Sequence, residues 1–275
     1  MTKVVLTIAG LDPSGGAGII ADIKTFSAFE CFGAAAITSI TFQNTTGVFG
    51  AIAQTAETVR GQVEPVIDDF EIAALKTGML PTREVIEEVA RLVAENNLKN
   101  FVVDPVVRST SGFDLIDDDA LSALVEKLFP LSDVVTPNIP EAERIAGIKI
   151  KDAADIRKAA KKMQSMGAKN VLIKGGHLFQ VKSEKGKVKS EDRIARDFLF
   201  CGDELRIFDA EFIETTATHG TGCTLAAAIA ANLAHGKSLV EAVEISKRFV
   251  TEAIRTAPNL GHGHSPINHF AKINK

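Results

Sequence analysis

The chain contains no tryptophan and no tyrosine, and only 3 of its 275 residues are cysteine. Side chains that stack on nucleic-acid bases would therefore have to come from its 16 phenylalanines. The formal net charge of −4 leaves no basic surplus to neutralise a phosphate backbone. We therefore do not expect a protein that binds nucleic acid.

The three cysteines are too few and too scattered to form a disulfide framework or a zinc site; they are Cys31, Cys201 and Cys223. No apolar run approaches the roughly 18 residues that a membrane-spanning helix needs. The first residues lead directly into a short apolar run and contain no small-residue cleavage site. These features predict a protein of the reducing cytoplasm that does not associate with a membrane.

Apolar runs alternate with amphipathic segments from end to end. We expect strands at 4–9, 34–42, 73–76, 101–104, 134–135 and 171–174, and helices at 17–29, 56–67, 81–95, 226–234 and 239–254. Such strands, separated by helices, predict a three-layer α/β/α fold with a mainly parallel central sheet. Two further runs, 197–200 and 205–208, predict a small antiparallel hairpin at the sheet edge. With neither linker nor repeat, we predict one domain over residues 1–275.

The segment 218–224 (THGTGCT) opens an alanine-rich helical run. Its two glycines allow an open backbone, so that N–H groups at the helix start can bind an anion. Cys223 lies in the first turn, where the same field is expected to lower the pKa of its thiol. The segment therefore offers an anion site beside a proton acceptor. The alternative is an ordinary helix start with a small buried cysteine.

Acidic residues follow two of the predicted strands. Asp104 comes directly after 101–103, and Glu141 lies shortly after 134–135. Because ligands of open α/β sheets bind beyond the carboxyl ends of the strands, this pair could hold Mg²⁺ against nucleotide phosphates. Lys174, at another strand end, could contact phosphate as a point charge. The alternatives are a turn residue, a helix cap and a surface lysine.

The glycine-rich segment 10–18 superficially fits a dinucleotide-binding fingerprint. The turn out of the strand is too long for that motif, and no acidic residue stands about 20 positions further on after a second strand. Asp22, inside the following helix, is at the wrong distance. We interpret the glycines as a floor against which a flat ligand lies. His235-Gly236-Lys237-Ser238 is no P-loop either, so that ATP would bind in a non-Walker manner.

Taken together, these segments resemble the ribokinase-like superfamily and, within it, the hydroxymethylpyrimidine/phosphomethylpyrimidine kinases of thiamine biosynthesis. The matching segments are 6–10 (LTIAG), 12–19 (DPSGGAGI), 21–26 (ADIKTF), 43–45 (QNT), 76–80 (KTGML), 103–106 (VDPV), 136–142 (TPNIPEA), 174–177 (KGGH), 218–224 (THGTGCT) and 261–270 (GHGHSPINHF). They cover nearly the whole chain in order, so that the resemblance is specific.

The resemblance implies a homodimeric enzyme that uses ATP and Mg²⁺. Its reaction transfers the γ-phosphoryl group to the hydroxymethyl oxygen of 4-amino-5-hydroxymethyl-2-methylpyrimidine, and then phosphorylates the monophosphate to the diphosphate. The implied site residues are Cys223 as proton acceptor where most superfamily members have aspartate; Gly220, Thr221 and Gly222 as anion hole; Gln43, Met79, Asp22, Gly10 and Val106 around the pyrimidine; Lys174, Asn138, Gly220 and Thr221 around ATP; and Asp104 and Glu141 around Mg²⁺.

One departure from the family concerns the second step. The family usually has lysine where this chain has Thr110, and Arg108 either replaces it as a phosphate ligand or is simply solvated. The charged segment after Phe179 either closes over the site or stays in solvent.

Two alternative functions remain. Pyridoxine and pyridoxal kinases of the superfamily phosphorylate a similar hydroxymethyl ring, although the amide of Gln43 favours an aminopyrimidine. A non-catalytic sensor of the vitamin precursor would keep the pocket without the catalytic residues.

Overall fold

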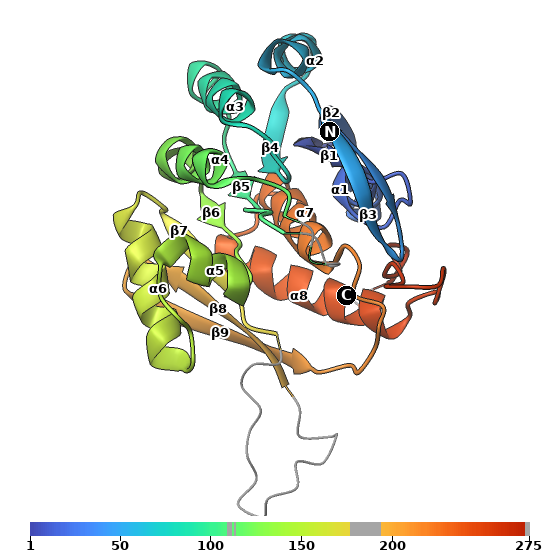
Figure 1. Cartoon of the computed structure of the whole chain (residues 1–275), viewed down its shortest axis with the longest axis vertical. Helices are drawn as coiled ribbons and strands as arrows, with labels where there is room; N and C mark the ends of the chain where they lie inside the picture. Colours follow the sequence, from blue (N-terminus) through green and yellow to red (C-terminus); the bar gives the residue numbers. More distant parts are fainter. Residues whose placement is uncertain (109–111, 113, 177–193, 273–275) are drawn as a thin grey trace, which may run out of the picture.

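The computed structural model describes residues 1–108, 112, 114–176 and 194–272 (Figure 1). Its strands form one sheet in the order β3-β2-β1-β4-β5-β6-β7-β8-β9. The strands are β1 (Val4–Leu11), β2 (Phe32–Asn44), β3 (Gly47–Ala53), β4 (Ile72–Thr77), β5 (Phe101–Val103), β6 (Val134–Val135), β7 (Asn170–Lys174), β8 (Ile194–Cys201) and β9 (Glu204–Glu211). Six neighbouring strands of the sheet are parallel, in the order β2-β1-β4-β5-β6-β7. The others pair antiparallel: β3 with β2, β8 with β7, and β9 with β8.

Helices cover both faces of this sheet (Figure 1). They are α1 (Gly18–Ala28), α2 (Ala56–Asp69), α3 (Arg83–Glu95), α4 (Asp118–Ala123), the π-helix η1 (Leu124–Leu128), the 3₁₀ helix η2 (Phe129–Leu131), α5 (Ile139–Ala146), α6 (Ala153–Ser165), α7 (Thr221–Ala234) and α8 (Leu239–Arg255). Helices α2 to α6 belong to one hydrophobic cluster, and α1, α7 and α8 belong to the other. The predicted three-layer fold is confirmed. No helix in the described part of the chain has both the length and the apolarity of a membrane span.

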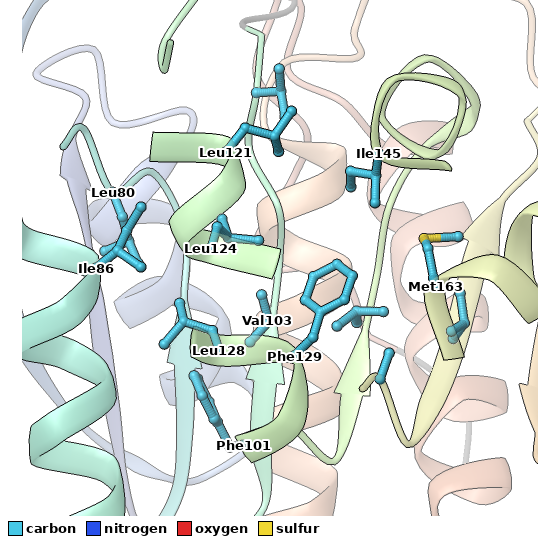
Figure 2. Packing of buried hydrophobic residues seen from close by; sticks show 14 of the residues in the cluster. Leu80, Ile86, Phe101, Val103, Leu121, Leu124, Leu128, Phe129, Ile145 and Met163 are labelled. Atoms are coloured by element: carbon cyan, nitrogen blue, oxygen red, sulfur yellow. The ribbon is translucent and has the colours of Figure 1, made fainter. Parts of the chain in front are cut away.

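The central strands are apolar throughout because each contributes to both clusters. Phe101 and Val103 point into the cluster under α2 to α6, where Phe101 lies near Leu128 and Phe129 in Figure 2, while Val102 points into the opposite cluster. This alternation follows from the two-residue period of a strand. Neither face of these strands is exposed to solvent, so their sequences are apolar at successive positions and do not alternate between apolar and polar residues.

The predicted antiparallel hairpin is confirmed as β8 and β9, joined at Cys201 and Glu204. The elements that were not predicted include β3, α4, η1, η2, α5 and α6. Strand β3 is rich in glycine and alanine, which are weak strand formers. In α6 the buried stripe consists largely of alanines, so that its apolar period is faint. The short helix α4 begins in a run of three aspartates, of which Asp117 is the N-cap.

Candidate active site

The carboxyl ends of the parallel strands and the start of α7 enclose a cavity of about 370 Å³. Of the residues predicted from the sequence, those that line it are Gly10, Gln43, Met79, Asp104, Val106, Asn138, Glu141, Lys174, Gly220, Thr221, Gly222 and Cys223. They come from segments more than two hundred residues apart in sequence. A parallel sheet brings them together because all its strand ends with the same polarity meet at one edge.

The predicted anion site lies at the start of α7. Gly220 is the N-cap residue, with a φ of 80°. The N–H group of Thr221 donates to the carbonyl oxygen of Thr218 at 3.3 Å, and the next two residues of the first turn, Gly222 and Cys223, line the cavity. A Cβ atom on Gly220 would lie 1.8 Å from the carbonyl oxygen of Gly16, so glycine is required here for space as well as for φ. Helix α7 is buried from Thr224 onward, which fixes this helix start against the sheet.

Cys223 lines the cavity, but its predicted acidity is wrong. Burial, together with the nearby carboxylates of Asp104 and Asp22, raises the pKa of the Cys223 thiol to about 11. The ammonium of Lys76 and a backbone hydrogen bond from Gly18 oppose this rise without cancelling it. The sequence argument considered the helix field alone, whereas removal from water dominates at this position. The sulfur is therefore a neutral thiol near pH 7.

Opposite Cys223, Lys174 lies between two carboxylates. Its Nζ is 3.0 Å from Oδ1 of Asp104, which also accepts a hydrogen bond from Thr136 Oγ1 at 3.1 Å. Burial alone would lower the pKa of Lys174, but Asp104 and Glu141 outweigh it and raise that pKa. Lys174 is therefore a charged ammonium at the cavity wall and no surface lysine.

Glu141 is the helix cap that the sequence offered as one alternative, and its position is also compatible with the other, a magnesium ligand. Its Oε2 accepts a hydrogen bond of 2.8 Å from the backbone N–H of Asn138, whose side chain caps the same helix turn in return. It also lines the cavity near Asp104. Burial raises the pKa of Glu141 to about 7, although Lys174 opposes this. Glu141 is thus a helix-capping residue whose carboxyl group also faces the site.

The residues present fit a magnesium ion bound largely through water. Asp104 and Glu141 supply hard carboxylate oxygens, which Mg²⁺ prefers. Asp104 Oδ2 and Lys174 Nζ lie close to Gly222, where an added Cβ would be 3.9 Å from the oxygen and 3.2 Å from the nitrogen, so that a side chain at position 222 would crowd these groups. Within the described ranges, no cluster of three or more His, Cys, Asp or Glu residues forms a complete protein-only metal site.

The opposite end of the cavity is suited to a flat ring. Gly10 and Met79 face each other so closely that a Cβ on Gly10 would lie 3.1 Å from the sulfur of Met79. Gln43 stands on β2 at the rim with its amide directed among Thr41 and His219, and Val106 follows β5. A glycine floor, a thioether and one amide are the elements of a pocket for a heteroaromatic ring.

Asp22 does not line the cavity, so its predicted contact with substrate is wrong. Its side chain is fully buried and forms an ion pair with Lys76, whose Nζ lies 2.8 Å from Oδ2, and it accepts a hydrogen bond of 2.6 Å from Thr7. Lys76 itself lines the cavity. Burial would lower the pKa of Lys76, but Asp22 outweighs it and raises that pKa. Lys76 was not predicted as a site residue, although a charged lysine at the end of the apolar strand 73–76 could have indicated it.

A second missed pair lies at the rim. His219 Nε2 is 2.7 Å from Oδ2 of Asp12, and both side chains are buried and line the cavity. The ring of His219 packs on Gly16, where a Cβ would come within 2.3 Å of it. Both residues stand inside segments that the sequence singled out, but no local pattern indicates that positions 207 apart form a pair.

The remaining residues lie at the cavity mouth, in the core or outside the described part of the chain. Arg108 is at the cavity mouth, 60% exposed and paired with Asp114 at 2.8 Å. His269 is buried, with its Nε2 3.1 Å from Thr224 Oγ1, and burial lowers its pKa to about 4. Thr110, His177 and the charged segment after Phe179 lie outside the described residues.

The chain is similar to a known protein family over nearly its whole length. The family model for phosphomethylpyrimidine kinase matches residues 12–268. The chain is 46% identical over 270 residues to the hydroxymethylpyrimidine/phosphomethylpyrimidine kinase of Haemophilus influenzae, covering 98% of this chain and 97% of that one. It is 44% identical over 266 residues to the thiamine biosynthesis bifunctional protein ThiED of Geobacter sulfurreducens, covering 97% of this chain and 52% of that protein. A crystal structure of Bacillus subtilis pyridoxal kinase with ADP matches with a TM-score of 0.87 and 36% identity, covering 98% of each chain.

Proposed function

Because this chain belongs to the phosphomethylpyrimidine kinase family, we propose that it phosphorylates 4-amino-5-hydroxymethyl-2-methylpyrimidine with ATP and then converts the monophosphate to the diphosphate. The chain is a ribokinase-like kinase of thiamine biosynthesis. One observation carries the proposal: the ring pocket at Gln43 and Met79 and the glycine-opened start of α7 belong to the same cavity. The hydroxymethyl group of a bound ring then faces the helix start. We also propose that residues 1–275 act as one domain.

The polar and charged groups of the cavity have two proposed roles: some stabilise the transferred phosphoryl group, and others hold the magnesium ion. The N–H groups after Gly220 and the ammonium of Lys174 stabilise charge on the transferred phosphoryl group, and Asn138 lies beside them at the cavity wall. Asp104 and Glu141 would hold Mg²⁺, which when bound neutralises charge on the nucleotide phosphates. Phosphoryl transfer needs mainly this positioning and charge stabilisation.

Cys223 lies where it can receive the proton of the acceptor hydroxyl. Because burial raises its pKa to about 11, the thiolate is scarce at neutral pH but is a strong base when it forms. Lys76, beside it in the cavity, stabilises that thiolate. If Cys223 acts as this base, the rate of phosphoryl transfer depends on the fraction of enzyme in which its thiol is ionised.

Pyridoxal is the second candidate substrate, because the solved relative described above is a pyridoxal kinase. The amide of Gln43 favours the aminopyrimidine, since pyridoxal offers no amino group to its oxygen. A buried polar group left without a partner costs about 1–3 kcal/mol, which gives a preference and allows a weaker second activity.

For the second phosphorylation, Arg108 is the cationic residue at the cavity mouth that can meet the phosphate of the monophosphate. Its ion pair with Asp114 is exposed and therefore weak, so the guanidinium is available. Diphosphate formation by an Arg108→Ala variant at the wild-type rate would remove this role.

The homodimer is a further proposal, and the exposed apolar face of β2 and β3 supports it. Ile40, Phe42 and Ile52 are 38% to 55% exposed, and Ile40 pairs directly with Ile52 across the two strands. Phe49, 68% exposed, stands at the bulge beside them. A patch of this kind on an edge hairpin commonly forms an interface. Light scattering should give twice the 29.3 kDa chain mass for the wild type and the monomer mass for Phe49→Asp. A cytoplasmic location also stays a proposal, with which the three free cysteines are compatible.

The experiment that tests the function measures ADP production with the aminopyrimidine, its monophosphate and pyridoxal as acceptors. We expect the two pyrimidines to be the preferred acceptors. Cys223→Ala should lower kcat by about 10²- to 10⁴-fold with little change in either KM. Cys201→Ala, at the far end of β8, is the matched control. Wild-type kcat in Cys223→Ala would show that the thiol accepts no proton, and turnover of pyridoxal alone would overturn the assigned reaction.

A further inference from the structure

The carboxamide of Gln43 has two orientations, related by a half turn, that present different groups to a ligand. In the structure, the amide oxygen lies 3.1 Å from Thr41 Oγ1 and the amide nitrogen lies 3.4 Å from His219 Nε2, and a half turn about the last side-chain bond exchanges the two. Which atom is nitrogen and which is oxygen must follow from the neighbouring donors and acceptors. The hydrogen bonds that Thr41 and His219 make to other groups determine which orientation of the Gln43 amide is favoured.

We propose that Asp12, His219 and Thr41 are positioning residues that fix the Gln43 amide with its oxygen toward His219 and its NH₂ group toward Thr41. The amide then accepts only a ring edge that carries its donor and acceptor in one order. This inference rests on the proposed function, because it specifies how that site selects its acceptor.

The first line of evidence comes from Asp12. Its carboxylate accepts hydrogen bonds of 2.9 Å from the backbone N–H groups of Ser14 and Ala17. Burial raises the pKa of Asp12, but the hydrogen bonds from His219 and Ser14 outweigh it and lower that pKa. A carboxylate oxygen 2.7 Å from His219 Nε2 requires that this nitrogen carry hydrogen. Asp12 takes that hydrogen, and a protonated Nε2 has no lone pair that could accept from the NH₂ group of Gln43. The amide oxygen is therefore the terminal atom that can face this nitrogen without setting two donors against each other.

The second line of evidence comes from the other end of the amide. Thr41 Oγ1 lies 2.9 Å from the backbone carbonyl oxygen of Leu11, which can only accept. A hydroxyl group has one hydrogen, and here Leu11 takes it. The neighbouring Gln43 atom must therefore donate to Thr41, which requires the NH₂ group. Two separate contacts on opposite ends of the amide thus select the same orientation.

This orientation determines which ring edge can bind. The free lone pair of the amide oxygen meets a donor, such as an exocyclic amino group, and the second hydrogen of the NH₂ group meets an adjacent ring acceptor. A 4-oxo ring has the opposite order, with a carbonyl in place of the amino group and hydrogen on the neighbouring nitrogen. It would place two acceptors and two donors face to face, so the fixed amide rejects it.

The test is a competition between 4-amino-5-hydroxymethyl-2-methylpyrimidine and its 4-oxo counterpart in one reaction with ATP. The product ratio gives the ratio of the two kcat/KM values and is independent of the fraction of folded enzyme. Thr41→Val removes the hydroxyl while keeping the shape, and Thr41→Ser restores the hydroxyl. His219→Phe removes the N–H from the other end while keeping a ring against Gly16.

We expect the wild type and Thr41→Ser to share a strong preference for the amino compound. That preference should fall by roughly tenfold in Thr41→Val and in His219→Phe, because the amide can then turn. An unchanged ratio in both variants would overturn the inference and leave the proposed function intact. A wild type that phosphorylates neither compound would instead overturn the proposed function, and this inference with it.

Discussion

The raised pKa of Cys223 makes the pH dependence of turnover a direct test of the catalytic proposal. With a pKa of about 11, roughly one thiol in 10⁴ is ionised at pH 7 and one in 10² at pH 9. If the thiolate takes the proton of the acceptor, kcat/KM should rise about tenfold per pH unit between pH 7 and 9, because this ratio follows ionisation in the free enzyme. The slope holds wherever the pKa lies well above 9.

The assay is ADP production with the aminopyrimidine held below its KM at pH 7, 8 and 9. Cys223→Asp provides a matched control, since a carboxylate is already ionised across this range and its profile should be nearly flat. Cys223→Ala, which has no base at this position, should also lose the tenfold slope. A flat wild-type profile, or the same slope in Cys223→Ala, would refute the assignment of the thiolate as the acting base.

Two further predictions concern stability. Lys76→Met leaves the fully buried Asp22 without its cation and should cost about 3–5 kcal/mol at pH 8 in urea unfolding; Lys76→Met/Asp22→Asn should recover most of it. Burial raises the pKa of Asp22, so the protonated carboxyl stabilises the folded variant at low pH, and this stabilisation is lost as the pH rises. The loss of unfolding free energy in Lys76→Met should therefore be smaller at pH 5 than at pH 8. Equal losses at both pH values would contradict this. Gly220→Ala should destabilise by at least about 1–3 kcal/mol, since its φ is 80° and a Cβ would overlap Gly16, whereas Gly61→Ala in α2, with open space around it, should be neutral or stabilising. Equal unfolding midpoints for the two alanine variants would show that the turn tolerates a side chain.

Sequence reasoning predicted most of the site because topology alone brings its parts together. Asp104, Lys174 and the helix start at Gly220 each follow a recognisable apolar run or precede a recognisable helix. In a parallel sheet, such positions converge at one edge whatever the details of packing. Gln43 was assigned through the family resemblance, and the structure places it on the same cavity.

What the sequence could not predict depends on surroundings in three dimensions. The thiol of Cys223 was expected to be acidic, but its pKa depends on lost solvation and on Asp104 and Asp22, which are distant in the chain. Asp22 was placed in the pocket because it lies in a matching segment, although its side chain points under the floor toward Lys76. Local patterns report which residues are near the site, and they do not report which way each side chain points.

The burial of α7 has a consequence for how acceptor preference can change. Every residue of this helix from Thr224 to Ala234 is buried, so the phosphate-binding end of the cavity is anchored in the core and tolerates little redesign. The ring-binding end includes Gln43 on β2, one strand in from the edge strand β3, where the side chain is not part of either hydrophobic cluster. Mutant libraries aimed at new alcohol acceptors should therefore vary the β2 end and keep the α7 end constant.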